Sequence, residues 1–203
     1  DGNVYETIQI GDQLWMAENL KVTHYNDGSE IPNITNNGDW GGLSTGAYGD
    51  YDNNPTNSET YGRLYNWYTV DDSRGVCPEG WHVPSDNEYT ILTDYLGGVE
   101  VAGGKMKSTG TIEAGDGLWY APNTGTTNES GFTVFPGGWR SVSEVPDSCQ
   151  DEYCRLGYYG EFWSSSDSDT YTAWARDLGY FNTFLTRNAW DKNYGFSVRC
   201  LKD

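Results

Sequence analysis

Positively charged side chains are scarce in this sequence. Of its 203 residues only 12 are Lys or Arg, against 30 Asp or Glu, and the formal net charge is −18 at pH 7. Nucleic acids and anionic membrane surfaces are bound by clustered Lys and Arg, and here the basic residues are scattered. We therefore expect no nucleic acid and no anionic lipid surface among the partners, and we attribute most of the negative charge to solubility.

Long apolar runs and familiar catalytic signatures are missing as well. No segment is apolar enough over a sufficient length to span a bilayer, so we expect no direct membrane insertion. There is no GxSxG nucleophile elbow. The only histidines are His24 and His82, and we interpret His82 as a structural residue beside a helix start rather than a general base. These absences favour a protein that is not an enzyme.

Aromatic residues and glycine are abundant. A mean hydropathy of −0.71 with this net charge would by itself indicate disorder. However, 9 Trp, 16 Tyr and 6 Phe can bury enough area to build a core with few aliphatic residues. The 26 Gly indicate tight turns. We predict one loop-rich domain over residues 1–203, and, because the chain begins with Asp1 rather than Met, a monomeric module of a larger protein.

Four cysteines, Cys77, Cys149, Cys154 and Cys200, leave three pairings open. An even number indicates two disulfides and a non-cytosolic compartment. Cys149 and Cys154 flank a short loop, which favours their pairing and leaves Cys77 to join Cys200 near the C-terminus. The alternative is a zinc site, but no CxxC pair is present and only two histidines could complete it.

Local patterns predict few regular elements. Residues 4–16 are typical of a β-hairpin that turns at Gly11. Residues 26–60 are polar and predict a long loop that is functional or locally pinned, and residues 61–70 predict a short helix. The runs EFWSSS, TAWARDLG and GFSVRC predict strands, the last at residues 195–200 beside the N-terminal hairpin.

The clearest predicted helix starts at Ser85. Ser85 and Glu88 have the spacing of a capping box, and Gly97 is placed to end the helix. Ile91, Leu92 and Tyr95 fall on what we predict to be its buried face. A second short helix is predicted over residues 99–107.

Several segments, in order and at similar spacing, resemble one known family. They are IGDQLWMAENL, GDYDNN with YGRLYNWY, CPEGWHVPSDNEY, TNESGF with FPGGWR, FWSSS, and GFSVRC. Together they resemble the Fibrobacter succinogenes major paralogous domain family, over nearly the whole chain. The family is similar in pattern to C-type-lectin-like domains and to the formylglycine-generating-enzyme fold. The resemblance implies an α+β, C-type-lectin-like domain with two or three short helices, short antiparallel strands and a large irregular loop region. It also implies a bacterial secreted or cell-surface protein.

An acidic segment is a candidate calcium site. Asp50, Asp52, Asn53 and Asn54 carry oxygens at the spacing that calcium-binding loops use, although the EF-hand pattern is not matched. The alternative is a turn held by Asx hydrogen bonds. The resemblance to lectin-like domains implies a further calcium ligand near the last strands, where Asp191 lies.

The candidate ligand-binding residues are Trp174, Tyr180, Trp190 and Asn193, because Tyr and Trp side chains are favoured at interfaces. We therefore expect a non-catalytic, calcium-dependent recognition domain of a bacterial adhesin or surface protein. Its ligand would be a peptide, bound by its C-terminal carboxylate, or a carbohydrate. The alternatives are a structural or assembly domain without a small ligand, and a hydrolase of polysaccharides.

Overall fold

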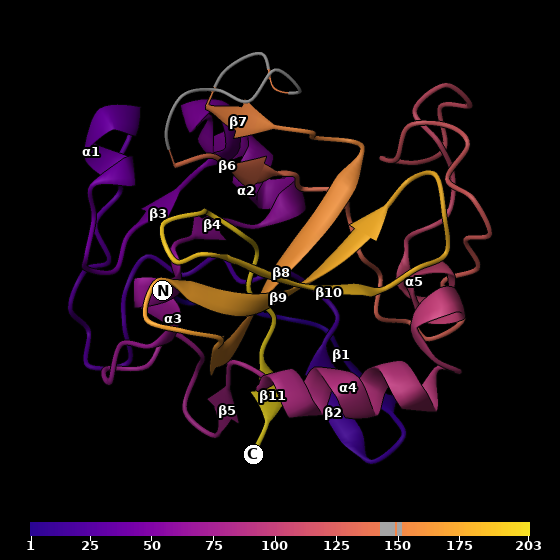
Figure 1. Ribbon diagram of the computed structural model, residues 1–203, viewed down its shortest axis with the longest axis horizontal. Helices are drawn as coiled ribbons and strands as arrows, with labels where there is room; N and C mark the ends of the chain where they lie inside the picture. The colour runs from indigo at the N-terminus through magenta and orange to yellow at the C-terminus, as the bar shows by residue number, and fades with distance from the viewer. Residues whose placement is uncertain (143–148, 150–151) are drawn as a thin grey trace.

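The computed structural model describes residues 1–142, 149 and 152–203. It is a mixed α/β domain in which short helices surround several small antiparallel sheets (Figure 1). Helices α4 (Asp86–Tyr95) and α5 (Val99–Met106) lie below and to the right of the central strands in this view. The shorter helices α1 (Asn37–Gly41), α2 (Pro55–Tyr61) and α3 (Trp67–Val70) lie to the left and above.

One sheet brings the two ends of the chain together. Its four strands have the order β1-β2-β11-β5, with bounds Thr7–Ile10, Gln13–Met16, Leu201–Lys202 and Trp81–His82. The predicted hairpin is confirmed, and Gly11 at its turn has φ +59°, a conformation that glycine adopts without strain. The C-terminal strand is Leu201–Lys202 rather than residues 195–200, of which residues 195–197 form isolated bridges.

A second sheet is the central element of the fold. It contains β8 (Tyr159–Asp167), β9 (Thr172–Gly179) and β10 (Thr186–Asp191) in the antiparallel order β10-β9-β8. The first two are the predicted EFWSSS and TAWARDLG strands. Side chains two residues apart share a face of a strand, so this sheet presents two distinct faces.

The long polar segment is pinned by short elements rather than being a plain loop. It contains α1, β3 (Tyr48–Gly49), a 3₁₀ turn η1 (Tyr51–Asn53) and most of α2. The helix predicted over residues 61–70 is wrong in its first half, where β4 (Leu64–Tyr65) pairs with β3. A further small pair joins β6 (Trp139–Arg140) to β7 (Tyr153–Cys154).

Helix α4 confirms the predicted start but not the predicted buried face. Ser85 accepts a hydrogen bond from Glu88 N, and the Glu88 side chain accepts one from Ser85 N, so the capping box is complete. Leu92 is buried, whereas Ile91 and Tyr95 are 49% and 65% exposed. The inward stripe is instead Tyr89, Leu92 and Leu96, at the i, i+3, i+7 spacing of one helix face.

The core is rich in aromatic rings and also contains buried basic residues. Arg199 is fully buried, and its guanidinium donates to Asn19 Oδ1 at 2.8 Å and to backbone carbonyls of Met16, Phe132 and Thr133. Burial lowers the pKa of Arg199 to about 9. A buried cation is tolerated when its donors are satisfied, and here Arg199 ties the N-terminal, middle and C-terminal segments together.

Two disulfides complete the framework. Cys77 is bonded to Cys200, and Cys149 to Cys154, which are the pairs that the spacing favours. The loop between Cys149 and Cys154 lies partly outside the described residues.

Candidate functional site

The first residue of the predicted calcium loop is engaged by the protein itself. Asp50 is buried, its carboxylate accepts a hydrogen bond from the Ser58 hydroxyl, and its Oδ1 lies 3.2 Å from Arg63 Nε. An ion pair and a hydrogen bond therefore balance this charge without a metal.

The rest of that loop has the turn geometry that we gave as the alternative. Asn54 Oδ1 accepts from Thr56 N at 3.1 Å and caps α2. Asn53 Oδ1 accepts from the Tyr153 hydroxyl at 2.8 Å, and Asn53 Nδ2 donates to Thr35 O at 3.3 Å. Asp52 is exposed at φ +56°. Within the described ranges, no group of three or more His, Cys, Asp or Glu side chains is placed to hold a metal ion.

The remaining predicted calcium-ligating residue, Asp191, is the last residue of β10. Its Oδ1 accepts a hydrogen bond from Asn193 N at 2.9 Å. The structure does not gather Asp191 with Asp50 and Asp52 into one acidic group. The Asn193 side chain donates to Leu43 O at 2.6 Å and so fixes the segment after α1. Asn193 is therefore engaged in local structure.

The predicted aromatic ligand residues do not converge on one surface. In the β9–β10 register, Trp174 pairs with Ala189 and Trp190 with Ala173, so the two tryptophans point to opposite faces of the sheet. The Arg187 guanidinium covers the Trp174 ring at 3.2 Å from its centroid. Trp190 packs against Tyr194 and Phe196.

The fourth candidate, Tyr180, belongs to a continuous row of rings that we call the aromatic strip. Successive centroids are 4.3, 5.1, 5.5, 6.1 and 5.7 Å apart. The members, in spatial order, are Tyr120, Tyr158, Tyr180, Phe181, Tyr159 and Trp139. Phe181 is 50% exposed, and the other rings are half-buried. The strip follows the end of the central sheet where β8 begins and β9 stops.

Two acidic side chains adjoin this strip on the same face of the sheet. Glu161 lies two residues after Tyr159 on β8 and is directly opposite Asp177 on β9. We call Glu161 and Asp177 the carboxyl pair; they are 3% and 7% exposed. The two carboxyl groups hydrogen-bond to each other.

The surroundings of the carboxyl pair disfavour the charged form of Glu161. Burial raises the pKa of Glu161 well above its usual value, and the neighbouring charge and hydrogen bonding of Asp177 raise it further. On the solvent side, Asn188 Nδ2 donates to Asp177 Oδ2, and the Thr186 hydroxyl donates to Asp177 O at 3.1 Å. Burial and the adjacent carboxyl group of Asp177 therefore both favour the neutral form of Glu161.

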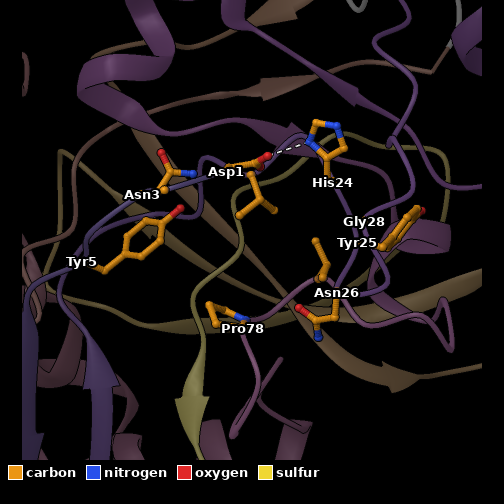
Figure 2. Close-up of a pocket in the computed structure, with 11 residues that line it drawn as sticks. Asp1, Asn3, Tyr5, His24, Tyr25, Asn26, Gly28 and Pro78 are labelled. Atoms are coloured by element: carbon orange, nitrogen blue, oxygen red, sulfur yellow. Dashed lines mark hydrogen bonds and ion pairs between the residues drawn. The ribbon is translucent and has the colours of Figure 1, made fainter.

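A separate cavity of about 570 Å³ lies beside the first residues of the chain (Figure 2). Its dashed contact is the ion pair of Asp1 Oδ1 with His24 Nδ1, at 2.6 Å. Asp1 Oδ2 also accepts a hydrogen bond from Thr23 N at 2.6 Å. Asp1 and His24 are thus occupied with each other.

Of the strip, only Tyr180 was named from the sequence as a ligand-binding candidate, and Glu161 was missed. A signal for Glu161 was present, since a carboxylate between Gly160 and Phe162 in an apolar strand run is unusual. That signal does not show which cross-strand residue faces Glu161.

A compact mixed α/β domain with two disulfides fits the class of extracellular proteins. The chain belongs to the Fibrobacter succinogenes major domain family, whose profile matches residues 8–202. No curated protein and no solved structure matches this chain. Within the described part, no helix has the length and apolar character needed to cross a bilayer.

Proposed function

We propose that this chain is a non-catalytic, extracellular recognition domain of a bacterial surface protein, that its fold is C-type-lectin-like, and that it binds carbohydrate at the aromatic strip. The observation that carries the proposal is the strip itself: six linked rings on one surface, with Phe181 half exposed. An exposed aromatic ring that continues into a row of half-buried rings is the kind of surface feature that marks interaction sites in soluble proteins.

Carbohydrate fits the chemistry beside the rings. The apolar faces of pyranose sugars pack on aromatic rings, and their hydroxyl groups need nearby oxygen and amide partners. The exposed Asn188 side chain lies on the face that carries Tyr159. A peptide ligand would also use the rings, and it is the alternative outcome of the test below.

The hydrolase alternative has one supporting observation. Two carboxyl groups that lie directly opposite each other on neighbouring strands resemble the carboxyl pairs of acid–base catalysts. However, both carboxyl groups are more than nine-tenths buried, whereas a glycosidase must bring both to the scissile bond. The geometry therefore favours binding over hydrolysis.

The test is binding of the wild-type domain and of Phe181→Ala to a panel of soluble neutral and acidic polysaccharides, measured by calorimetry. Truncating a ring at the centre of a contact surface costs about 2 kcal/mol, so we expect the affinity to fall about 30-fold. The matched control is Tyr171→Ala, because Tyr171 is 76% exposed and has no place in the strip. Equal losses in both variants, or binding of peptides and of no polysaccharide, would contradict the proposal.

A further inference from the structure

We propose that the free edge of strand β10 pairs with the same edge of a second copy of this chain, so that two central sheets join into one. This interaction surface goes beyond carbohydrate binding and does not use the aromatic strip, which lies where β8 begins and β9 stops. It also departs from the monomeric module that we expected from the sequence.

The first step is the direction of the backbone groups of β10, the outermost strand in the order β10-β9-β8. Lys192 N, directly after β10, donates to Tyr171 O at 2.9 Å, on the side of β9. Successive residues of a strand turn their backbone N–H and C=O groups to opposite sides. The backbone groups of Arg187, Ala189 and Asp191 therefore point away from β9.

The second step is that these outward groups are open. No hydrogen bond to the backbone N–H or C=O of Arg187 or Ala189 is found among the described residues. Arg187, Ala189 and Asp191 are all exposed. An unpaired strand edge of this kind is a template for main-chain pairing with another strand.

Both ends of the open stretch are closed by the chain itself. Before β10, Leu185 N donates to Val99 O at 2.9 Å, and after it, Tyr194 N donates to Asp191 O at 2.9 Å. Ala189 lies in the middle of what remains open. A second strand that uses the whole stretch is therefore centred on Ala189.

The third step is charge complementarity. In antiparallel pairing about a two-fold axis at Ala189, Arg187 lies opposite Asp191 of the second copy, and Asp191 lies opposite its Arg187. Opposite charges that face each other stabilise paired strands. Arg187 Nε and Nη2 bond to Asp86 at 2.8 and 3.0 Å, which leaves Nη1 for this contact. Asp191 Oδ1 accepts from Asn193 N, which leaves Oδ2.

Other arrangements of two copies lack this match. A shift by two residues places Arg187 or Asp191 opposite Ala189, so no opposite charges face each other. An in-register parallel pair sets Arg187 beside Arg187, and like charges destabilise paired strands. A surface that is complementary to itself is what a two-fold interface requires, whereas a strand from another protein needs no such match. The occupant we infer is therefore a second copy of this chain.

The experiment is sedimentation analysis over a range of protein concentrations at about 0.15 M salt, where repulsion between chains is screened beyond about 8 Å. We expect the average mass of the wild-type protein to rise with concentration toward twice that of one chain. Arg187→Glu and Asp191→Arg should each weaken the dimer about tenfold or more, because each replaces two attractive pairs with two repulsive ones. Asp12→Arg, a matched reversal at an exposed hairpin turn, should leave the dimer intact.

An equimolar mixture of the two variants separates the charge pairs from effects on folding. Arg187→Glu and Asp191→Arg chains face each other with opposite charges at both pairs, so the mixture should dimerise where each variant alone is monomeric. Asp86 keeps its contact with Arg176 at 2.8 Å in either variant. Ala189→Pro removes the central outward N–H and should prevent dimerisation, since edge strands tolerate proline where the N–H faces solvent.

Three results would overturn the inference. The first is a wild-type protein that stays monomeric at every concentration, which is also the result expected if this edge pairs only with a strand of another protein. The second is a dimer that Arg187→Glu and Asp191→Arg leave unweakened. The third is a mixture of these two variants that stays monomeric while both melt as the wild type does.

Discussion

His82 shows how a residue that attracts a catalytic interpretation serves the fold instead. Its Nε2 lies 3.0 Å from Glu88 Oε1, the carboxylate of the capping box, and its Nδ1 lies 2.7 Å from Asp203 Oδ1. The ring therefore links β5, the start of α4 and the C-terminal segment. Partial burial by itself would lower the pKa of His82, but hydrogen bonds to Asp203 and Glu88 and their charges raise it above its usual value.

This raised pKa predicts a dependence of stability on pH. The ion pairs stabilise the folded state fully below the pKa of an unfolded histidine, about 6.5, and are lost as the pH rises through the higher folded pKa of His82. We expect the melting-temperature difference between the wild-type protein and His82→Gln to be largest near pH 6 and to shrink toward pH 9. Calorimetry at several pH values measures it, and Asp203→Asn should weaken the dependence. A difference that grows with pH would contradict the assignment.

At the scale of single residues, the sequence was a limited guide to the site. Composition identifies an acidic chain, but it does not say which carboxylates are already paired. Asp50 looked like a metal ligand because of its neighbours in sequence, yet its partner Arg63 comes from 13 positions further on. Glu161 attracted no attention, because the residue that faces it lies on another strand. Which residue faces another across two strands is decided by the tertiary structure and is not visible in the local sequence.

At the scale of elements, local chemistry was more informative. The capping box follows from side chains that bond to their own backbone, so Ser85 and Glu88 specify the helix start by themselves. The end of α4 follows from Gly97, whose positive φ of 105° favours glycine. The buried face of α4 was predicted wrongly, because a helix with few apolar residues does not define one stripe by pattern alone. Strand β10 was missed for a similar reason, since its exposed side chains hide the alternation.

Helix α5 gives a prediction about close packing. A Cβ added at Gly103 would lie 2.2 Å from Phe184 O, a backbone atom in the segment before β10. Gly103→Ala should therefore destabilise the protein by about 1–3 kcal/mol through overpacking, although alanine favours helices by about 1 kcal/mol. Urea unfolding measures the change, and Val101→Ala, at an exposed position of the same helix, should stay within about 0.5 kcal/mol. A Gly103→Ala protein as stable as the wild type would show that α5 is free to move.

At the scale of the whole molecule, only part of the strand order could be predicted from the sequence. The pairing of the C-terminal segment with the N-terminal hairpin was anticipated, but β11 also pairs with β5 and so lies between two distant parts of the chain. The bond between Cys77 and Cys200 fixes the same closure covalently, at a sequence separation of 123. The overall fold thus depends on contacts of long sequence separation, which are entropically costly to form.

The two disulfides differ in how much of that cost they remove. Under the chain-entropy description, a bond spanning 123 positions stabilises the fold by about 5 kcal/mol, and one spanning 5 positions by about 2 kcal/mol. We therefore expect Cys77→Ala with Cys200→Ala to lower the free energy of unfolding by clearly more than Cys149→Ala with Cys154→Ala, as measured by guanidinium unfolding. Buried Cys77 and Cys200 also lose packing when truncated, so Cys→Ser versions of the same pairs, compared with reduced wild-type protein, separate the bond from the cavity. Equal losses for the two pairs would mean that residues 77 and 200 are held together without the bond, by the pairing of β11 with β2 and β5 alone.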